Sequence, residues 1–323
     1  MRAATIVDGT ITVRDRPDPV AGTGEVLVRV RAAGLNGADL MQVEGHYPPP
    51  PGIPPDIPGL EVAGEVVAVG PKVTRFSPGD RVMSILGGAG QAELAVVHER
   101  VAMPVPAIPE CGGVPWDQAG GFPEVFSTAH DALFSQCHLS MGERLLVHGA
   151  AGGVGSAAVQ LGVATGARVT ATVRNPALRE AVSALGATVV APEDFVDHGP
   201  FDVVIELVGA PNLAADVAAL AVNGRVVVIG IGAGSTAEVD LRALMGCRGT
   251  IRSSTLRPRP LEEKALLARR VEAGVIPLLA AGRVRVPVAA TFPLAEVAAA
   301  YSAFAAGGKF GKIVLLMGDL DHP

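Results

Sequence analysis

Residues 144–155 read Arg-Leu-Leu-Val-His-Gly-Ala-Ala-Gly-Gly-Val-Gly, and this stretch decides the fold. An apolar run leads into a glycine-rich turn, and the turn leads into a helical stretch at 154–165. A backbone without Cβ lets a pyrophosphate approach closely, and the unpaired N–H groups and dipole of a helix N-terminus favour an anion. A bare glycine turn is also common as plain structure. Between a buried strand and a helix, however, it predicts dinucleotide binding.

Apolar strands and Ala-rich helices alternate on both sides of that turn. Such alternation is typical of a parallel sheet covered on both faces, so we expect an α/β, doubly wound domain with six strands. The expected strands are 144–148, 168–173, 188–190, 202–205, 225–229 and 250–253. The expected helices are 154–165, 176–185, 212–221 and 241–246.

The segments on either side of this domain differ from it in composition and in the pattern of apolar residues. Up to about residue 122 the chain is rich in Pro and Gly, with short β-type runs at 25–30, 64–69 and 81–85. These runs predict a compact antiparallel barrel. The tail from 261 holds two helices, at 261–273 and 294–304, and a last strand at 312–316. Since the six-stranded sheet is already complete, we expect this strand to return to the barrel. The domains would then be 1–122 with 261–323, and 123–260 inserted between them.

Composition and charge argue against several classes of binding partner and against a membrane location. The net charge of −6 offers no electrostatic footprint for nucleic acid or an anionic membrane. Residues 145–167 contain no Asp, Glu, Lys or Arg over a length that could span a bilayer, but their six glycines and strand-like first half argue against a membrane helix. Cys111, Cys137 and Cys247 form no CxxC pair, as expected for free thiols in the cytoplasm.

The end of the second expected strand indicates which dinucleotide binds. NAD-binding domains place Asp or Glu about 20 residues after the glycines, where it accepts hydrogen bonds from the ribose 2′-OH. That count leads here to Arg174, and no carboxylate follows until Glu180. A guanidinium can pair with a 2′-phosphate, with Arg179 assisting, so we predict NADPH. A solvated arginine at a strand end is the alternative.

Several further segments match one family in the same order. They are Ala32-Ala-Gly-Leu-Asn-Gly-Ala-Asp39, Gly45-His-Tyr-Pro48, Pro58-Gly-Leu-Glu-Val-Ala-Gly64, Pro78-Gly-Asp-Arg-Val82 and Gly308-Lys-Phe-Gly-Lys-Ile-Val-Leu315. With the glycine turn, they make nearly the whole chain resemble the zinc-independent quinone oxidoreductases, the zeta-crystallin-like branch of the medium-chain dehydrogenase/reductase superfamily. The resemblance implies a GroES-like β-barrel catalytic domain, an inserted Rossmann domain, NADPH in the cleft between them, and a homodimer.

The same resemblance bears on metal and substrate. Zinc-dependent relatives carry Cys where this chain has Asn36 and His where it has Leu60, and their four-cysteine loop is missing here. A catalytic zinc needs three N, S or O protein ligands, so no metal is expected. Without one, hydride delivery to an acceptor that is already electron-poor remains feasible. This argument favours quinones and α,β-unsaturated carbonyl compounds as substrates.

The resemblance also implies site residues. Asn36 would lie near the nicotinamide ribose or the acceptor oxygen, and Tyr47 would donate a hydrogen bond on the substrate side. Alternatively, Asn36 caps a turn and Tyr47 packs on the prolines that follow. Val43 stands where many relatives have Arg, which leaves the quinone activity open. From geometry and resemblance together, the expected cofactor contacts are Asn36, Thr128, Ala150, Gly152, Gly153, Val154, Gly155, Arg174, Arg179, Leu207, Val208, Gly230, Ile231, Ser254, Arg257, Phe310 and Lys312.

Rival interpretations remain for the function and for one motif. An enoyl reductase acting in trans on acyl or polyketide thioesters has a similar glycine turn, and so has a non-catalytic NADPH-binding protein. The proline-rich run 48–58 would form a rim of the cleft or, alternatively, a polyproline ligand for a partner domain.

Overall fold

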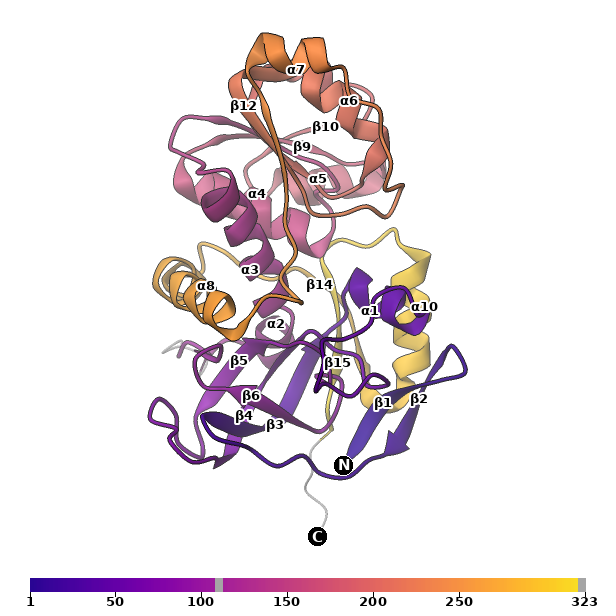
Figure 1. The fold of residues 1–323 in the computed structure, drawn as a ribbon, viewed down its shortest axis with the longest axis vertical. Coiled ribbons are helices and arrows are strands. Elements are labelled where there is room, and N and C mark those ends of the chain that lie inside the picture. Colours follow the sequence, from indigo (N-terminus) through magenta and orange to yellow (C-terminus); the bar gives the residue numbers. More distant parts are fainter. Residues whose placement is uncertain (108–112, 319–323) are drawn as a thin grey trace. The chain divides into compact units, whose positions relative to one another are not determined.

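The computed structural model describes residues 1–107 and 113–318, and its chain forms two compact units (Figure 1). The first unit comprises Met1–Ser127, Leu256–Gly307 and Lys312–Pro323, and the second comprises Thr128–Thr255 and Gly308–Gly311. The sequence predicts that the inserted domain begins after residue 122 and ends at residue 260. In the structure the second unit begins after residue 127, and its main segment ends at residue 255. Cys111 lies outside the described residues.

The second unit is built on a six-stranded sheet in which every strand pair is parallel. Its central strands are buried on both faces, which explains their continuous apolar sequence. The predicted doubly wound α/β domain is confirmed. In spatial order the strands are β10 (Thr188–Val190), β9 (Arg168–Thr172), β8 (Arg144–Val147), β11 (Phe201–Glu206), β12 (Leu220–Val228) and β13 (Thr250–Ser253).

Helices connect these strands, and two of them end earlier than the sequence suggests. The expected helix 176–185 is a 3₁₀ turn followed by α5 (Arg179–Ser183), so it ends at Ser183. The expected helix 212–221 is α6 (Ala210–Ala218), because Leu220 already pairs with Phe201 as the first residue of β12. Leu220 is buried there against the sheet core, and this packing overrides the helix propensity of the alanines around it. The other helical elements are α3 (Pro123–His130), the π-helical η1 (Asp131–Gln136), α4 (Gly153–Thr165), η2 (Pro176–Leu178), α5 (Arg179–Ser183), η3 (Phe195–His198) and α7 (Leu241–Cys247).

The first unit holds a larger, mostly antiparallel sheet. Its spatial order is β14 (Val288–Pro293), β15 (Lys312–Leu316), β3 (Glu25–Gly34), β4 (Glu61–Val69), β5 (Arg81–Ile85) and β7 (Met103–Pro104), and β6 (Leu94–His98) also pairs with β3. The last strand of the chain thus returns to the barrel as predicted. The sequence did not reveal β14, which runs parallel to β15.

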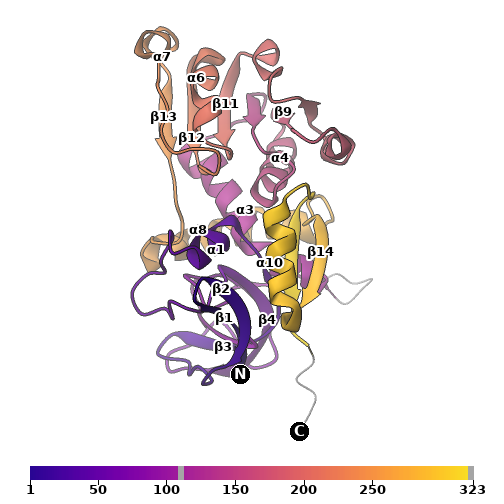
Figure 2. The same ribbon diagram turned by 90° about the vertical axis from the view of Figure 1, so that its right-hand side faces the viewer.

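A hairpin and short helices complete this unit. Helix α10 (Val297–Ala306) contacts both β14 and β15, and Figure 2 shows it in front of β14. The hairpin strands are β1 (Arg2–Val7) and β2 (Thr10–Asp15), and the helical elements are α1 (Gly37–Val43), α2 (Trp116–Gly120), α8 (Leu261–Gly274), α9 (Ile276–Ala280), η4 (Leu294–Glu296) and α10 (Val297–Ala306).

The charge-free stretch 145–167 is divided between β8, the glycine turn and α4, a helix of 13 residues. In the part of the chain that the structure describes, no helix combines the length and the apolar character needed to cross a membrane.

Candidate functional site

The glycine turn of the second unit has the backbone that its sequence predicts. Gly149 is left-handed, with a φ of 61°. Ala150 is completely buried, and its amide donates to the carbonyl oxygen of Thr172 at the end of β9 (3.2 Å). Gly152 is exposed and forms the N-cap of α4. The turn is therefore tied to the sheet on one side and open to solvent on the other.

The first turn of α4 leaves amide groups free for a ligand. The first helical hydrogen bond runs from Ser156 to the carbonyl oxygen of Gly152, so the amides of Gly153 and Val154 precede the helical ladder. No acidic residue lies in this first turn. The N-terminus of α4 can therefore hold an anion such as a pyrophosphate.

Gly155 allows the helix to approach the turn. A Cβ at this position would lie 2.4 Å from the carbonyl oxygen of Gly149 and 2.7 Å from the Cα of Ala150. Both are backbone atoms that cannot move aside. Any other residue at position 155 would push α4 away from the turn.

A segment from the far end of the chain packs against the same turn. The amide of Gly311 donates to the carbonyl oxygen of Ala151 (2.8 Å), and Gly311 forms a parallel bridge with Gly152. The preceding residue, Phe310, is half-buried. Phe310, which the resemblance assigns to the cofactor, thus lies near the glycine turn within the second unit.

The two arginines at the end of β9 differ in their surroundings. Arg174 is exposed, and within the described part of the chain its guanidinium has neither a hydrogen bond nor an ion pair. Arg179 is half-buried and donates through Nε to the carbonyl oxygen of Val173 (3.1 Å). Arg179 therefore closes the strand end, whereas Arg174 remains available to an anionic ligand.

The turns after β11 and β12 lie in contact with each other. A Cβ on Gly230 would lie 2.2 Å from the carbonyl oxygen of Leu207, so the two backbones touch. Leu207, Val208 and Gly230 are half-buried, and Ile231 is exposed. These predicted cofactor residues form one surface at the carboxyl edge of the sheet.

Two other predicted cofactor residues of the second unit lie in α3 and after β13. Thr128 is buried in α3. Ser254, directly after β13, donates its hydroxyl to Asp131 (2.7 Å), and its amide donates to the carbonyl oxygen of Val228 (3.2 Å). Ser254 therefore lies beside the end of β12.

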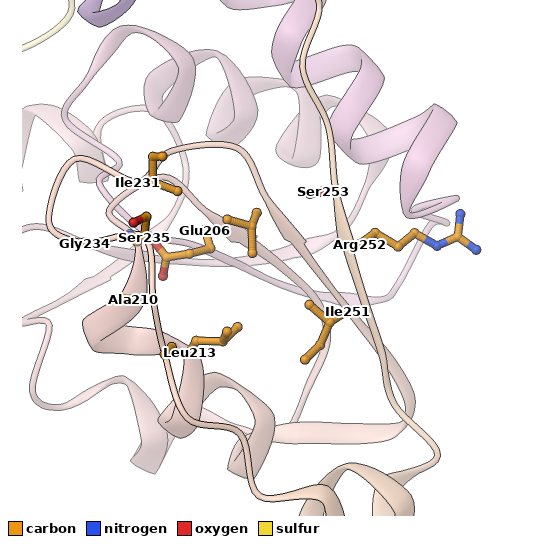
Figure 3. A pocket seen from close by; sticks show the side chains of 12 residues that line it. Glu206, Ala210, Leu213, Ile231, Gly234, Ser235, Ile251, Arg252 and Ser253 are labelled. Carbon is orange, nitrogen blue, oxygen red and sulfur yellow. Dashed lines mark hydrogen bonds between the residues drawn. The ribbon is translucent and has the colours of Figure 1, made fainter. Parts of the chain in front are cut away.

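An open pocket of about 380 Å³ lies beside α6, at the ends of β11, β12 and β13. Figure 3 shows Leu213 and Ile251 pointing toward one another across it, while the side chain of Arg252 points away. Among the residues that line it, Ile231 is the one predicted cofactor contact. Glu206 also lines it, next to a buried polar cluster that sequence spacing did not reveal.

That cluster consists of His148, Glu206 and Asp216, each with no exposed surface. His148 Nε2 lies 2.8 Å from Asp216 Oδ1, and its Nδ1 lies 3.0 Å from the Thr172 hydroxyl. Burial raises the pKa of Asp216 to about 6, and the nearby Glu206 carboxyl acts in the same direction, while His148 opposes them. The Oδ2 atom of Asp216 has no partner among the described residues.

Glu206 fixes the turn that follows β11. Its Oε1 accepts hydrogen bonds from the amides of Val208 and Gly209, the latter at 2.7 Å. Its Oε2 accepts one from the Asn212 side chain at 2.9 Å. These bonds give Glu206 a structural role at the end of β11.

A second buried charge cluster lies in the first unit and contains Asn36. The Lys312 ammonium donates to Glu61 Oε1 (2.6 Å), to Asn36 Oδ1 (2.7 Å) and to the carbonyl oxygen of Leu35 (2.6 Å). The Asn36 amide in turn donates to Glu61 (3.0 Å). All three N–H donors of Lys312 are used here. Lys312 therefore holds Asn36 in place.

Carboxyls around this cluster have raised pKa values. Burial raises the pKa of Asp39 to about 6, although its carboxylate accepts hydrogen bonds from the amides of Asn36 (2.8 Å) and Gly59 (3.1 Å). Burial and then the charge of Glu61 raise the pKa of Glu124 to about 8. The bond from Asn36 to Asp39 is that of a helix cap, so the alternative expectation for Asn36, capping, describes its backbone.

The first unit does not fit a catalytic zinc at the position of Asn36. An amide and the apolar side chain of Leu60 stand where zinc-dependent relatives place Cys and His. Lys312 places an ammonium against both Asn36 and Glu61, and a cation at this spot would be repelled by it.

Tyr47 and Arg257 lie together in the first unit. Tyr47 is half-buried at the start of the proline-rich loop, and its carbonyl oxygen accepts a hydrogen bond from Arg257 (2.7 Å). Arg257 is buried, and the side-chain hydrogen bonds that it makes to described residues all remain in this unit. Val43 packs against the core of the same unit, where the hydrophobic side chain suits its surroundings.

Two family models together match most of the chain. Residues 22–135 match the family described as "Alcohol dehydrogenase GroES-like domain", and residues 185–315 match "Zinc-binding dehydrogenase". The chain is 31% identical to a quinone oxidoreductase of Lama guanicoe, over 93% of this chain and 91% of the relative. The chain belongs to the quinone oxidoreductase family of the medium-chain dehydrogenase/reductase superfamily.

Two other proteins are similar to this chain over nearly its whole length. An acryloyl-coenzyme A reductase of Metallosphaera sedula is 31% identical, over 94% of this chain and 95% of the relative. The crystal structure of an alcohol dehydrogenase superfamily protein from Novosphingobium aromaticivorans has a TM-score of 0.85 and 31% identity, covering 98% of this chain and 100% of that one. The chain is thus an oxidoreductase of a nicotinamide-dependent superfamily.

Proposed function

We propose that this protein uses NADPH to reduce quinones or related α,β-unsaturated carbonyl compounds, and that it does so without zinc. The observation that carries the proposal is the buried ammonium of Lys312, bonded to Asn36 and Glu61. It lies against Asn36, the position at which zinc-dependent relatives carry a cysteine. An acceptor that spreads negative charge through its own conjugation does not need a metal to polarise it.

The second unit would hold the cofactor through its glycine turn and strand ends. The amides of Gly153 and Val154 would bind the pyrophosphate, and the exposed guanidinium of Arg174 would pair with the 2′-phosphate of NADPH. Glu206 would keep the turn after β11 in the shape that receives the cofactor. When bound, NADPH supplies a hydride.

The first unit would orient the acceptor and help to move a proton. A quinone takes up one hydride and one proton and leaves as the hydroquinone, while NADP⁺ is formed. The Tyr47 phenol would offer a hydrogen bond to the acceptor oxygen as negative charge develops on it. The Asn36 side chain, which is held by Lys312, Glu61 and Gly34, would fix the shape of the place where the acceptor lies. Positioning and hydrogen bonding are the protein's main contributions.

The test is NADPH oxidation by the purified protein after dialysis against EDTA. We expect turnover of 9,10-phenanthrenequinone that added Zn²⁺ does not increase, and weaker activity with NADH. Activity that chelation abolishes and Zn²⁺ restores would contradict the zinc-free mechanism. Tight NADPH binding without oxidation by any electron-poor acceptor would favour a non-catalytic binding protein.

The similarity to an acryloyl-coenzyme A reductase favours a second candidate, reduction of enoyl thioesters in trans. The chemistry is related, because the thioester carbonyl also withdraws charge from the double bond. Rates with crotonyl-coenzyme A and with phenanthrenequinone, compared as kcat/KM, separate the two candidates. A value for the thioester that exceeds the quinone value would favour the enoyl reductase.

We also propose that the protein is a cytoplasmic homodimer. β13 is an edge strand of its sheet, and α7, just before it, has no buried residue. This helix exposes Leu241 (68%) and Met245 (77%), as expected of a surface that a second copy covers. In light scattering, wild type should have twice the mass of one chain, and Met245→Glu should shift it toward the monomer. A monomeric wild type would exclude the dimer.

A further inference from the structure

Arg257 is a buried cation whose partners are unusual. Arg257 is 5% exposed, and burial lowers the pKa of its guanidinium. Among the described residues, no carboxylate lies within ion-pair distance of it. A buried guanidinium is unfavourable unless its donors are satisfied, so its hydrogen bonds indicate why it is there.

Those hydrogen bonds join three segments of the first unit. Nε donates to the carbonyl oxygen of Gly87 (2.8 Å), Nη1 to that of Tyr47 (2.7 Å), and Nη2 to Gln42 Oε1 (2.5 Å). Gln42 lies in α1 and donates through Nε2 to the carbonyl oxygen of Pro55. One side chain thus connects α1, the proline-rich loop and the turn after β5.

The guanidinium also packs on the aromatic ring of Tyr47. Its Cζ lies 4.9 Å from the ring centroid, within the range of a cation–π contact. Arg257 therefore holds both the backbone and the ring of this residue. Two contacts of different kinds restrict the phenol far more than either would alone.

The surroundings fix Arg257 itself. The Lys264 ammonium in α8 donates to its carbonyl oxygen (2.7 Å). A Cβ on Gly88 would lie 3.4 Å from Nη2 and 2.8 Å from the side chain of Ile53, so little room remains for another arrangement. The guanidinium is a rigid support rather than a mobile surface charge.

We propose that Arg257 is a positioning residue for Tyr47 and so determines how the electron-poor acceptor is oriented. This role differs from the cofactor contact that the resemblance suggests for Arg257. It rests on the proposed function of Tyr47 as a hydrogen-bond donor to the acceptor. A lysine cannot replace the arginine here, because one ammonium cannot reach three diverging acceptors and also stack on the ring.

The experiment compares Arg257→Lys and Arg257→Met with Tyr47→Phe and the double variants. We expect Arg257→Met to lower kcat/KM for 9,10-phenanthrenequinone by about tenfold to hundredfold, as misplacement of a reacting group does. Arg257→Lys should lose nearly as much. The Kd for NADPH, from fluorescence titration, should change by less than about twofold. In the Tyr47→Phe background, Arg257→Met should have no further effect on kcat/KM.

A matched control is Arg81→Met in the same unit. The Arg81 guanidinium also stacks on an aromatic ring, that of Trp116 at 4.0 Å, and donates to the carbonyl oxygen of Val114 (2.9 Å). Its loss should lower the melting temperature without lowering kcat/KM. If Arg257→Met does not fold, Gln42→Ala removes one acceptor but keeps the cation, and it should lower kcat/KM in the same direction by a smaller factor.

The outcomes separate this inference from the function on which it rests. Unchanged kcat/KM in both Arg257→Met and Arg257→Lys would overturn it, as would a loss of NADPH affinity that accounts for the fall. An Arg257→Met effect that persists in full beside Tyr47→Phe would overturn it even if Tyr47 matters. If Tyr47→Phe alone leaves quinone reduction intact, the proposed role of Tyr47 fails, and the inference fails with it for that distinct reason.

Discussion

The charged side chains of the two polar clusters are almost completely buried in both units, but the clusters differ in how these charges are balanced. In the first unit, one ammonium meets a carboxylate, an amide oxygen and a backbone carbonyl, so each donor of Lys312 has an acceptor. In the second unit, His148 faces two carboxyls, and Asp216 keeps one oxygen unpartnered among the described residues. The first cluster is satisfied as a set of fixed charges, whereas the second depends on where a proton resides.

Arg174, at the exposed end of β9, contrasts with the buried cations Lys312 and Arg257. Arg174 has no partner in the described chain, although Lys312 and Arg257 each use several donors. A cation whose acceptors come from its own chain fixes structure, while a cation that faces solvent beside an anion-binding turn is free for a ligand. Partner count, rather than residue type, therefore distinguishes support from recognition.

The largest expected effect comes from breaking the satisfied cluster. Lys312→Met leaves Glu61 buried without its cation, and removal of one partner from a buried ion pair destabilises a protein by about 3–5 kcal/mol. We expect a large fall in the urea midpoint measured by circular dichroism. The double variant Lys312→Met with Glu61→Gln should regain part of that loss, since the unpaired charge is gone.

The matched control is Arg100→Met, which breaks an exposed ion pair with Glu262 in the same unit. It should leave the urea midpoint almost unchanged, because surface pairs contribute little to stability. Equal destabilisation by Arg100→Met and Lys312→Met would show that burial does not distinguish these two cations.

A smaller effect, on binding rather than folding, is expected at Arg174. Arg174→Asp should weaken NADPH binding by roughly tenfold to hundredfold, as loss of a charge-assisted hydrogen bond would, and should improve NADH binding. Fluorescence titration with both cofactors measures this. Arg168→Asp, at the other end of the same strand, is the control and should leave the NADPH/NADH ratio as it is. An unchanged ratio in Arg174→Asp would show that another group recognises the 2′-phosphate.

Much of the fold could be predicted because its local signals agree. β10, β13 and β15 have the bounds expected from short apolar runs, and β8 and β9 end one residue early. β14 was missed because its sequence, Val-Ala-Ala-Thr-Phe-Pro, has only weak strand character, and its partner β15 lies about twenty residues further along the chain. A strand that is specified by its partner carries little signal of its own.

Candidate residues of the site could be named from the sequence where the chemistry follows a count along the chain. Gly155 and Arg174 are found from their spacing to the turn. Asn36 and Lys312 were named by resemblance, but their contact spans 276 residues of sequence and could not be anticipated. His148 and Asp216 were missed because buried charge is recognised only from the neighbours that surround it. Their signal was an ionisable residue in an otherwise apolar strand end and helix.

The smallest expected effect tests whether a proton is really held in the second cluster. Burial raises the pKa of Asp216 from 3.8 to about 6, so between these values the folded protein retains a proton that the unfolded chain has lost. The contribution of Asp216 to stability therefore decreases as the pH rises from about 4 to 6, and Asp216→Asn should make the decrease shallower, while Asp39 and Glu124 keep their own contributions. Urea midpoints at several pH values measure the slope. Asp202→Asn is a control of opposite sign, because Arg144 lowers the pKa of Asp202 and its contribution is lost as the pH falls. If wild type and Asp216→Asn have parallel pH profiles, Asp216 is ionised throughout this range, and the two buried clusters do not differ in the way described above.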